Sequence, residues 1–275
     1  MKKHFLIAAL LAATAAHAQT PQGEVKGRAV AHTVESAKAV IAGAAVVLPA
    51  GIAGKVPFAG AFRDVPAEAR GSVPVVVFLH GSSGLRLAAI AEWQQWLATL
   101  GIASIAPDSF GLRDRLTYTS PVGKDVYEKI HALRASEIGL AVEALKGTSW
   151  ADTRRMVLAG TSEGAPAVAR YGGEGFLGKI IFAWSCEDNY FVQSHQTSTN
   201  REMPVLNIIS TTDPFFSAAN AWIGNPSPKG HCGPALKSNT RASIVLIPDA
   251  PHTLINLPAA RLAVAGFLME LLPRQ

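Results

Sequence analysis

Short apolar runs alternate with amphipathic stretches along most of this chain. Most of the runs are continuously apolar rather than alternating, which is typical of strands that are covered on both faces in a parallel sheet. The stretch 44–62 differs, and its pattern indicates two antiparallel strands at a sheet edge. The runs that predict strands of the main sheet are 73–79, 102–106, 155–159, 179–184, 205–210 and 243–247.

Helical patterns occupy the spaces between these strands. Apolar residues recur at helical spacing from Ile90 to Leu100, and Gly101 follows as a stop signal. The same spacing predicts a long helix over 126–145 and a final helix that begins at Pro258. Strands that alternate with helices predict an α/β fold, with one mostly parallel central sheet and helices on both of its faces.

The first residues have a different character from the rest of the chain. Residues 1–18 are organised like a secretory signal peptide, with two lysines, an apolar run over 5–15, and small residues at Ala16 and Ala18. The apolar run is too short to span a bilayer comfortably. We therefore expect an exported protein, periplasmic or secreted, in which residues 19–275 form a single α/β domain without a stable membrane anchor.

Composition narrows the classes of partner. Apolar residues make up 49% of the chain, which is enough for the core of one large domain. The formal net charge is +5, but the basic residues are scattered and form no run, so we do not expect a nucleic-acid partner. A small-molecule substrate is the remaining expectation.

Cys186 and Cys232 are the two cysteines of the chain. In an oxidising compartment they permit one intramolecular disulfide, and the alternative is a pair of unrelated buried thiols. Neither cysteine belongs to a C-x-x-C pair or to a spaced set of Cys and His, so the sequence predicts no metal site.

The pattern GTSEG at 160–164 carries the most specific chemistry. It follows the apolar residues 156–159 and precedes 165–170, a stretch compatible with a helix. In a G-x-S-x-G turn, a strand runs directly into a helix and the serine projects alone from a strained backbone. The flanking glycines avoid collisions between Cβ atoms as the chain reverses. This context makes Ser162 a candidate nucleophile.

A serine nucleophile needs a base, usually a histidine that is oriented by a carboxylate. On this kind of fold the chain order is serine, then acid, then histidine. Asp213 and His252 follow predicted strands in that order, so we predict a triad of Ser162, Asp213 and His252. Asp188, which follows the preceding strand, is the alternative acid.

A tetrahedral intermediate also needs N–H donors for its oxyanion. One expected donor is the backbone N–H of Glu163, directly after the candidate nucleophile. The second is expected from the small residues at 80–84, HGSSG, which follow an early strand. Ser82 is the preferred donor there, with Ser83 as the alternative. His80, at the start of this turn, is predicted to be a buried structural histidine.

Two long polar stretches follow strands and should emerge at the carboxyl edge of the sheet, where ligands bind in open α/β folds. They span 187–203 and 213–241. Cys186 directly precedes the first stretch, and Cys232 lies inside the second. A disulfide would pin the two loops together. Aromatic residues in or beside these loops are candidates for an apolar substrate pocket: Trp184, Tyr190, Phe191, Phe215, Phe216 and Trp222.

Together these motifs resemble the α/β-hydrolase superfamily, and within it the dienelactone hydrolase-like esterases. The likeness covers roughly 73–272 and rests on HGSSG at 80–84, PDSFG at 107–111, and the GTSEG turn with the later Asp213 and His252. The resemblance implies hydrolysis of esters, lactones or thioesters without a cofactor.

One departure from that family changes the expected substrate. Dienelactone hydrolases proper have a cysteine at the turn, where this chain has Ser162. The serine and the export signal favour a general serine carboxylesterase that acts on a small-molecule ester through an acyl-enzyme. A serine peptidase or an acyltransferase would share the same triad, and a non-catalytic binding protein could keep the same fold.

Overall fold

The structure, a computed structural model, describes residues 22–273. The predicted signal peptide, residues 1–18, lies outside this range. Among the described helices, none combines the length and apolarity that a membrane crossing requires.

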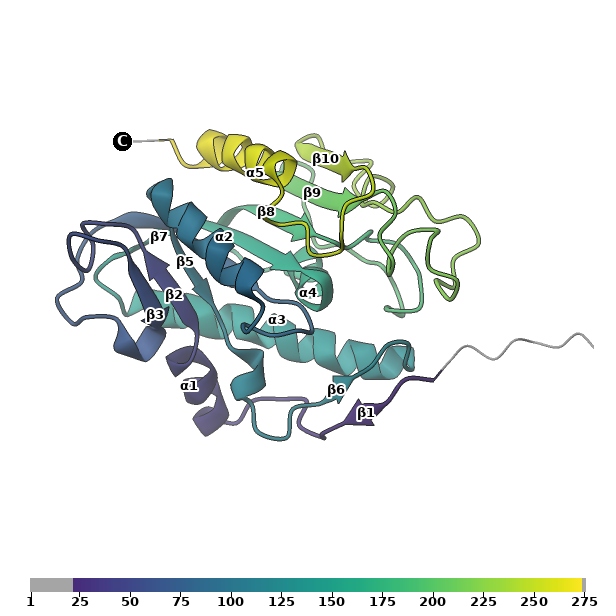
Figure 1. Ribbon diagram of the computed structural model, residues 1–275, viewed down its shortest axis with the longest axis horizontal. Helices are drawn as coiled ribbons and strands as arrows, with labels where there is room; N and C mark the ends of the chain where they lie inside the picture. The colour runs from purple at the N-terminus through teal and green to yellow at the C-terminus, as the bar shows by residue number, and fades with distance from the viewer. Residues whose placement is uncertain (1–21, 274–275) are drawn as a thin grey trace, which may run out of the picture.

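A central sheet of eight strands organises the described part of the chain (Figure 1). The order across the sheet is β10-β9-β8-β7-β4-β5-β2-β3. Strand β2 pairs antiparallel with both β5 and β3, and all the other neighbouring strands of this sheet are parallel. The mostly parallel sheet and the antiparallel pair at one edge are both as predicted. The strands are β2 (Ala45–Leu48), β3 (Phe58–Ala61), β4 (Val73–Leu79), β5 (Ala103–Ala106), β7 (Ala151–Thr161), β8 (Phe176–Phe182), β9 (Val205–Ser210) and β10 (Ala242–Ile247).

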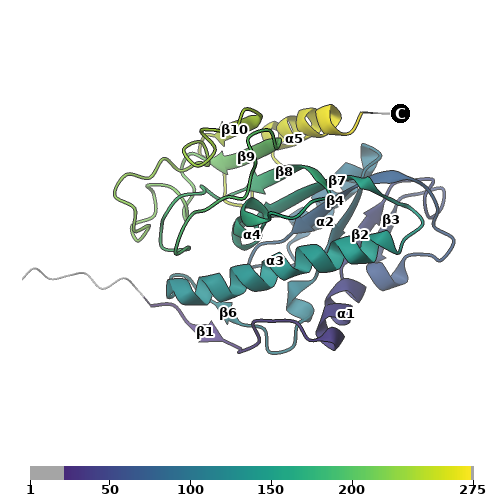
Figure 2. The ribbon, with the colours of Figure 1, turned by 180° about the vertical axis from the view of Figure 1, so that it is seen from behind.

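Helices cover both faces of this sheet, as the alternating pattern predicted. Two of them, α2 (Ala88–Thr99) and α5 (Pro258–Leu271), pack on one face (Figure 1). The long α3 (Lys124–Lys146) and the short α4 (Ala165–Arg170) pack on the other face, and α1 (Val34–Ala42) lies against α3 (Figure 2).

Strand β4 shows why the predicted strands are continuously apolar. Val75, Val77 and Leu79 point into the core beneath α3 and α4, whereas Val76 and Phe78 point into the core beneath α2 and α5. Because successive side chains face opposite sides of a sheet, a strand covered on both faces needs apolar residues at every position.

Some elements differ from the sequence expectation. Strand β7 continues to Thr161, so it runs without interruption into the GTSEG turn. Strand β8 ends at Phe182 rather than at 184, because Ala183 adopts a positive φ of 47° that breaks the extended backbone. Helix α1 was not predicted, and neither was a small antiparallel pair of β1 (Val25–Lys26) with β6 (Thr117–Tyr118). The short 3-10 turns are η1 (Phe62–Asp64), η2 (Ser109–Gly111) and η3 (Ser162–Gly164).

The two long polar stretches contain no helix or strand in the described chain, and they extend beyond the carboxyl ends of β8 and β9 (Figure 1). A disulfide joins them, because Cys186 and Cys232 are bonded with an S–S distance of 2.05 Å. Of the two alternatives for these cysteines, the structure therefore contains the bonded one. Strand β9 helps to hold the junction, since buried Asn207 donates to the carbonyl of Trp184 and accepts from the N–H of Cys232.

Backbone segments approach one another closely where β7 ends. A Cβ atom on Gly164 would lie 2.5 Å from the carbonyl oxygen of Leu79 and 2.8 Å from that of His80. A Cβ atom on Gly160 would lie 2.7 Å from Val168 in α4. Only glycine fits at these two positions without movement of the backbone or of packed side chains, which accounts for the glycines of the motif.

We therefore expect Gly164→Ala to lower the free energy of unfolding by about 1–3 kcal/mol, the usual cost of overpacking a tight site. Gly139→Ala is the matched control, because Gly139 is exposed in α3 and its Cβ would meet nothing within 4 Å. That change should stabilise the helix by about 0.5–1 kcal/mol. Urea unfolding of the two variants checks this, and equal effects would contradict the close approach.

Candidate active site

Ser162 occupies a strained turn between β7 and α4. Its φ is 52°, in the left-handed region that residues other than glycine rarely adopt. Thr161 ends the strand and η3 begins at Ser162 itself, so the chain reverses direction at this residue. The conformation is the one expected for a serine whose side chain projects from the end of a strand.

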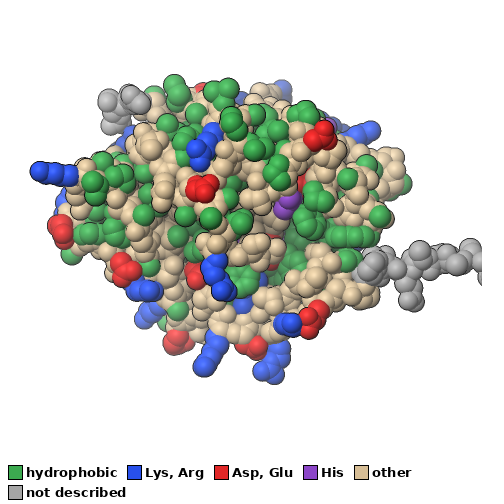
Figure 3. All heavy atoms as spheres, viewed as in Figure 1, with side chains coloured by type: hydrophobic (Ala, Val, Ile, Leu, Met, Phe, Trp, Pro, Cys, Tyr) green, Lys and Arg blue, Asp and Glu red, His purple; other side chains and the backbone are tan. Residues whose placement is uncertain are grey.

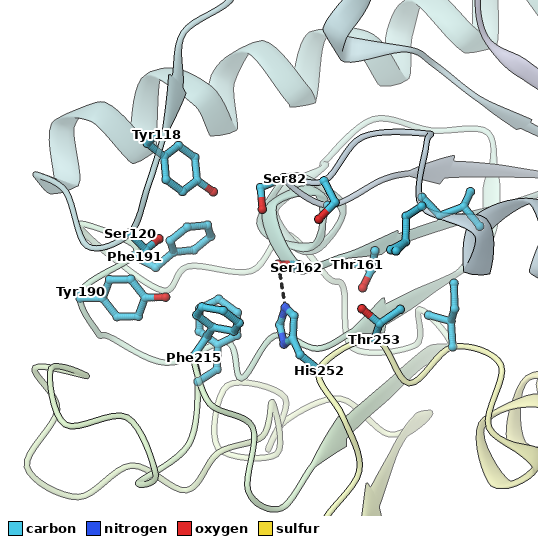
Figure 4. A pocket seen from close by; sticks show the side chains of 16 residues that line it. Ser82, Tyr118, Ser120, Thr161, Ser162, Tyr190, Phe191, Phe215, His252 and Thr253 are labelled. Carbon is cyan, nitrogen blue, oxygen red and sulfur yellow. Dashed lines mark hydrogen bonds between the residues drawn. The ribbon is translucent and has the colours of Figure 1, made fainter. Parts of the chain in front are cut away.

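Three side chains from distant parts of the chain meet at this turn. Nε2 of His252 lies 2.8 Å from Oγ of Ser162 (Figure 4), and Nδ1 of the same ring lies 2.7 Å from Oδ2 of Asp213. Asp213 follows β9 and His252 follows β10, so the ends of three parallel strands supply the three groups. The structure thus brings together the three residues that the chain order selected.

The Asp213 carboxylate is buried and held by the backbone. Its Oδ1 accepts hydrogen bonds from the N–H groups of Phe215 and Phe216, at 2.9 and 3.0 Å. These bonds leave Oδ2 directed at the histidine. A carboxylate oriented in this way selects the tautomer in which Nδ1 of His252 carries the proton and Nε2 accepts one.

The alternative acid, Asp188, lies in a different environment. Its side chain is 65% exposed, and its Oδ1 accepts the backbone N–H of His195 at 2.9 Å. The side chain of His195, whose Nδ1 lies 3.0 Å from the same oxygen, lowers the pKa of Asp188, and the backbone hydrogen bond lowers it further. Asp188 forms no hydrogen bond with His252, so the geometry favours Asp213 for the position beside the imidazole.

The turn at 80–84 passes directly beside Ser162. A Cβ atom on Gly81 would lie 3.1 Å from the Cβ of Ser162, and Gly81, Ser82 and Ser83 all line the cavity in front of it. Glu163 directly follows the same serine in η3. The two segments expected to supply oxyanion donors are therefore neighbours in space.

His80 is buried and supports this turn from behind, as predicted. Its Nε2 accepts the backbone N–H of Ser109 at 3.2 Å, and its Nδ1 lies 2.7 Å from the carbonyl oxygen of Gly81. Burial lowers the pKa of His80 well below its usual value, and the charge of Arg134 lowers it further. The ring is therefore neutral, with its proton on Nδ1, where it donates to Gly81.

Two buried arginines connect the elements behind the candidate nucleophile. Arg115 donates through Nη2 to Oε1 of Glu163 at 2.6 Å, and Nε of Arg134 lies 3.8 Å from the same oxygen. Arg134 also donates through Nη2 to the carbonyl of His80 at 3.0 Å, and it pairs with Glu137. Arg134 thus touches both segments expected to supply oxyanion donors.

The sequence motifs did not predict this buried network of arginine and glutamate side chains. A signal for it exists in α3, where Arg134 and Glu137 fall at inward positions among Leu133 and Ile138. Charged residues on the apolar stripe of a helix indicate a buried ion pair. No comparable pattern marks Arg115, which lies in an irregular segment before β6.

A cavity of about 140 Å³ opens in front of Ser162 and His252. Four of the aromatic residues predicted for a pocket line it: Tyr190, Phe191, Phe215 and Phe216. The other two do not. Trp184 packs behind Phe216, with ring centroids 5.0 Å apart, and Trp222 packs behind Tyr190 at 4.4 Å.

The cavity also has lining residues that the sequence did not indicate. Tyr118 and Ser120 come from the segment around β6, and Ile255 follows His252. Within residues 22–273, no group of three or more His, Cys, Asp or Glu side chains is arranged to hold a metal ion.

The surface charges are mixed in sign. Lys and Arg side chains are interspersed with acidic ones over the face seen in Figure 3.

Comparisons with known proteins show similarity at the level of the fold. No protein-family model matches the chain, and no curated protein matches it. A dienelactone hydrolase from Anabaena variabilis is similar in structure, with 17% identity and a TM-score of 0.51 over 91% of this chain and 97% of that one. Est1E from Butyrivibrio proteoclasticus has 14% identity and a TM-score of 0.53 over 84% and 94%.

A peptidase also has this fold. Dipeptidyl peptidase 4 from Porphyromonas gingivalis is 15% identical, with a TM-score of 0.50 over 74% of this chain and 32% of that one. These likenesses agree with the observed fold. It has a mostly parallel sheet with helices on both faces and a strand-turn-helix at Ser162. The chain has the α/β-hydrolase fold, as the dienelactone hydrolase and esterase structures similar to it do.

Proposed function

We propose that this protein is a serine hydrolase that cleaves carboxylic esters. The observation that carries the proposal is the hydrogen-bonded relay from Ser162 Oγ to His252 Nε2 and from His252 Nδ1 to Asp213 Oδ2, at 2.8 and 2.7 Å. The strained φ of Ser162 supports it, since such strain recurs at functional sites.

In the proposed mechanism, Nε2 of His252 accepts the hydroxyl proton of Ser162 as Oγ attacks the ester carbonyl. The imidazolium that forms is stabilised by the Asp213 carboxylate, which stays ionised. The same proton then passes from Nε2 to the leaving alcohol, and an acyl-enzyme on Ser162 remains. A water molecule, deprotonated by His252, releases the acid and restores the serine.

The oxyanion of each tetrahedral intermediate needs donors that are already in position. We assign them to the backbone N–H of Glu163 and to that of Ser82, with Ser83 as the alternative. Supporting this assignment, Gly81 approaches Ser162 closely, and Arg134 contacts both segments through Glu163 and the carbonyl of His80. Fixed donors stabilise the transition state without further reorganisation.

Ester cleavage is favoured over peptide cleavage by the cavity. Among its described lining residues there is no Lys, Arg, Asp or Glu that could bind a charged peptide terminus. The peptidase with the same fold is covered over only 32% of its length, so that likeness adds no argument for peptide substrates. The Cys186–Cys232 disulfide supports the further proposal that the protein is exported.

A fluorophosphonate probe tests the nucleophile. We expect the probe to label the wild-type protein and Ser162→Ala to abolish the label, because the probe forms a covalent bond only with an activated serine. Ser120→Ala is the control, since Ser120 lines the same cavity but forms no hydrogen bond with His252. Labelling that survives in Ser162→Ala would exclude Ser162 as the nucleophile.

Substitution of each of two aspartates tests which one is the acid of the triad. Asp213→Asn should lower kcat by about 10³- to 10⁴-fold, because an amide at this position favours the wrong histidine tautomer. Asp188→Asn should leave kcat close to the wild-type value, since Asp188 pairs with His195 in the loop. Both variants should give unchanged circular dichroism. A large loss confined to Asp188→Asn would reverse the assignment.

Glu163→Gln tests the buried network. The change removes the negative charge that pairs with Arg115 where both side chains are at most 3% exposed, so it should cost about 3–5 kcal/mol of stability. We also expect kcat for an ester to fall about tenfold or more with little change in KM, because the adjacent oxyanion donor is displaced. Glu143→Gln breaks an exposed pair with Lys146 and should have little effect on either quantity.

A further inference from the structure

The cavity beside Ser162 has an aromatic side. Figure 4 shows Tyr118, Tyr190, Phe191 and Phe215 together on one side of the Ser162–His252 pair, with Ser120 among them. Thr161 and Thr253 lie on the other side. A group attached to the reacting carbonyl would meet aromatic rings in one direction only.

The rings on the aromatic side of the cavity, here called the aromatic wall, pack against one another. The rings of Phe191 and Phe216 are 5.3 Å apart, those of Tyr190 and Phe191 are 5.7 Å apart, and Phe215 lies 4.6 Å from the His252 ring. Edge-to-face and tilted contacts at these distances are the favourable arrangements for aromatic pairs. Behind the wall, the Cys186–Cys232 bond holds together the two loops that supply these rings. The surface is therefore formed before any ligand binds.

Hydroxyl groups, rather than charges, provide the polarity of this side. Figure 4 shows the hydroxyls of Tyr118, Ser120 and Tyr190 directed into the cavity. Burial raises the pKa of Tyr118 well above its usual range, and the carboxylate of Glu163 raises it further. Burial also raises the pKa of Tyr190. Both phenols therefore stay protonated and neutral at any physiological pH.

The lining of the cavity offers no cation to an anion. None of the sixteen described lining residues is Lys, Arg, Asp or Glu. Asp213 lies directly behind the wall, and its described partners are His252 and two backbone N–H groups rather than a Lys or Arg side chain. A carboxylate that entered the cavity would lose its water shell without gaining a cation, and it would face the negative charge of Asp213.

The size of the cavity limits the ligand further. Its volume is about 140 Å³. An apolar protein cavity of about 150 Å³ is known to hold one benzene molecule. The space directly in front of Ser162 is therefore comparable in size to a single aromatic ring.

We propose that the aromatic side of this cavity accepts the single ring of a small, uncharged aromatic ester and excludes a carboxylated ring of the same shape. The inference names a substrate class for the proposed esterase and so rests on that proposed function. Its recognition step is nevertheless a property of the cavity, and binding measures it apart from catalysis.

Calorimetry with Ser162→Ala tests the inference on uncleaved ligands. One pair of probes is 4-acetoxybenzamide and 4-acetoxybenzoate, and the second pair, with the ester reversed, is methyl 4-carbamoylbenzoate and monomethyl terephthalate. The members of each pair differ in the charge on the ring substituent. We expect at least one amide to bind measurably and its carboxylate partner to bind at least about 100-fold more weakly. Equal binding within a pair, or no binding of either amide, would overturn the inference.

A substitution that improves carboxylate binding gives a stronger test. Adding Ser120→Arg to Ser162→Ala places a cation among the cavity hydroxyls, and it should improve carboxylate binding by about tenfold or more. Thr119→Arg is the matched control, because Thr119 is the exposed neighbour outside the cavity lining. Equal gains in both variants would show that charge acts from the surface and would overturn the inference. Thermal unfolding of each variant verifies that it is folded.

Two further measurements test the size limit of the cavity and separate ligand binding from catalysis. On Ser162→Ala, 2-naphthyl acetate should bind at least about tenfold more weakly than phenyl acetate, since the cavity holds one ring. Tighter binding of the naphthyl ester would contradict the single-ring limit. If Ser162→Ala binds the uncharged esters but the wild-type protein neither cleaves them nor reacts with the fluorophosphonate, the proposed function is wrong and the binding inference stands.

Discussion

The close approach of two backbone segments behind Ser162 is the constraint on which the rest of the site depends. The carbonyl groups at the end of β4 lie so near Gly164 that a Cβ atom there would be within 2.5 Å of the first of them. This contact puts the turn at 80–84 beside Ser162 and lets Gly81 reach the serine closely. Backbone packing, rather than a long side chain, therefore sets the distance between the candidate nucleophile and the turn.

Charge is distributed unequally around this contact. Behind the turn, Arg115, Arg134, Glu137 and Glu163 are buried and neutralise one another. In front of it, the described cavity lining is aromatic, aliphatic or hydroxylic. Buried ion pairs hold segments in register at a cost in desolvation, so they are useful where geometry has to be kept and harmful where a substrate has to enter. The arrangement is consistent with a rigid scaffold behind a neutral pocket.

Local sequence signals predicted the parts of the molecule that depend on short stretches of chain. Continuous apolar runs located the strands of the parallel sheet, because burial on both faces demands apolar residues at every position. The glycines around Ser162 marked the strained turn, and the order of Asp213 and His252 followed from the order of strands in such sheets. The ends of β7 and β8 were missed, because Thr161 and Ala183 carry no local signal for the point at which pairing stops.

The sequence by itself determined the sheet, its two covered faces, the turn at Ser162 and the identity of its candidate partners, since each rests on a local pattern or on chain order. Only the tertiary structure decided which aspartate reaches His252, which aromatic rings face the cavity, and that Arg134 contacts both Glu163 and His80. These contacts join residues that are far apart in the chain, such as Arg134 and His80, which are 54 positions apart. No periodicity or motif encodes such contacts, because they depend on how the strand ends and loops pack against one another in space.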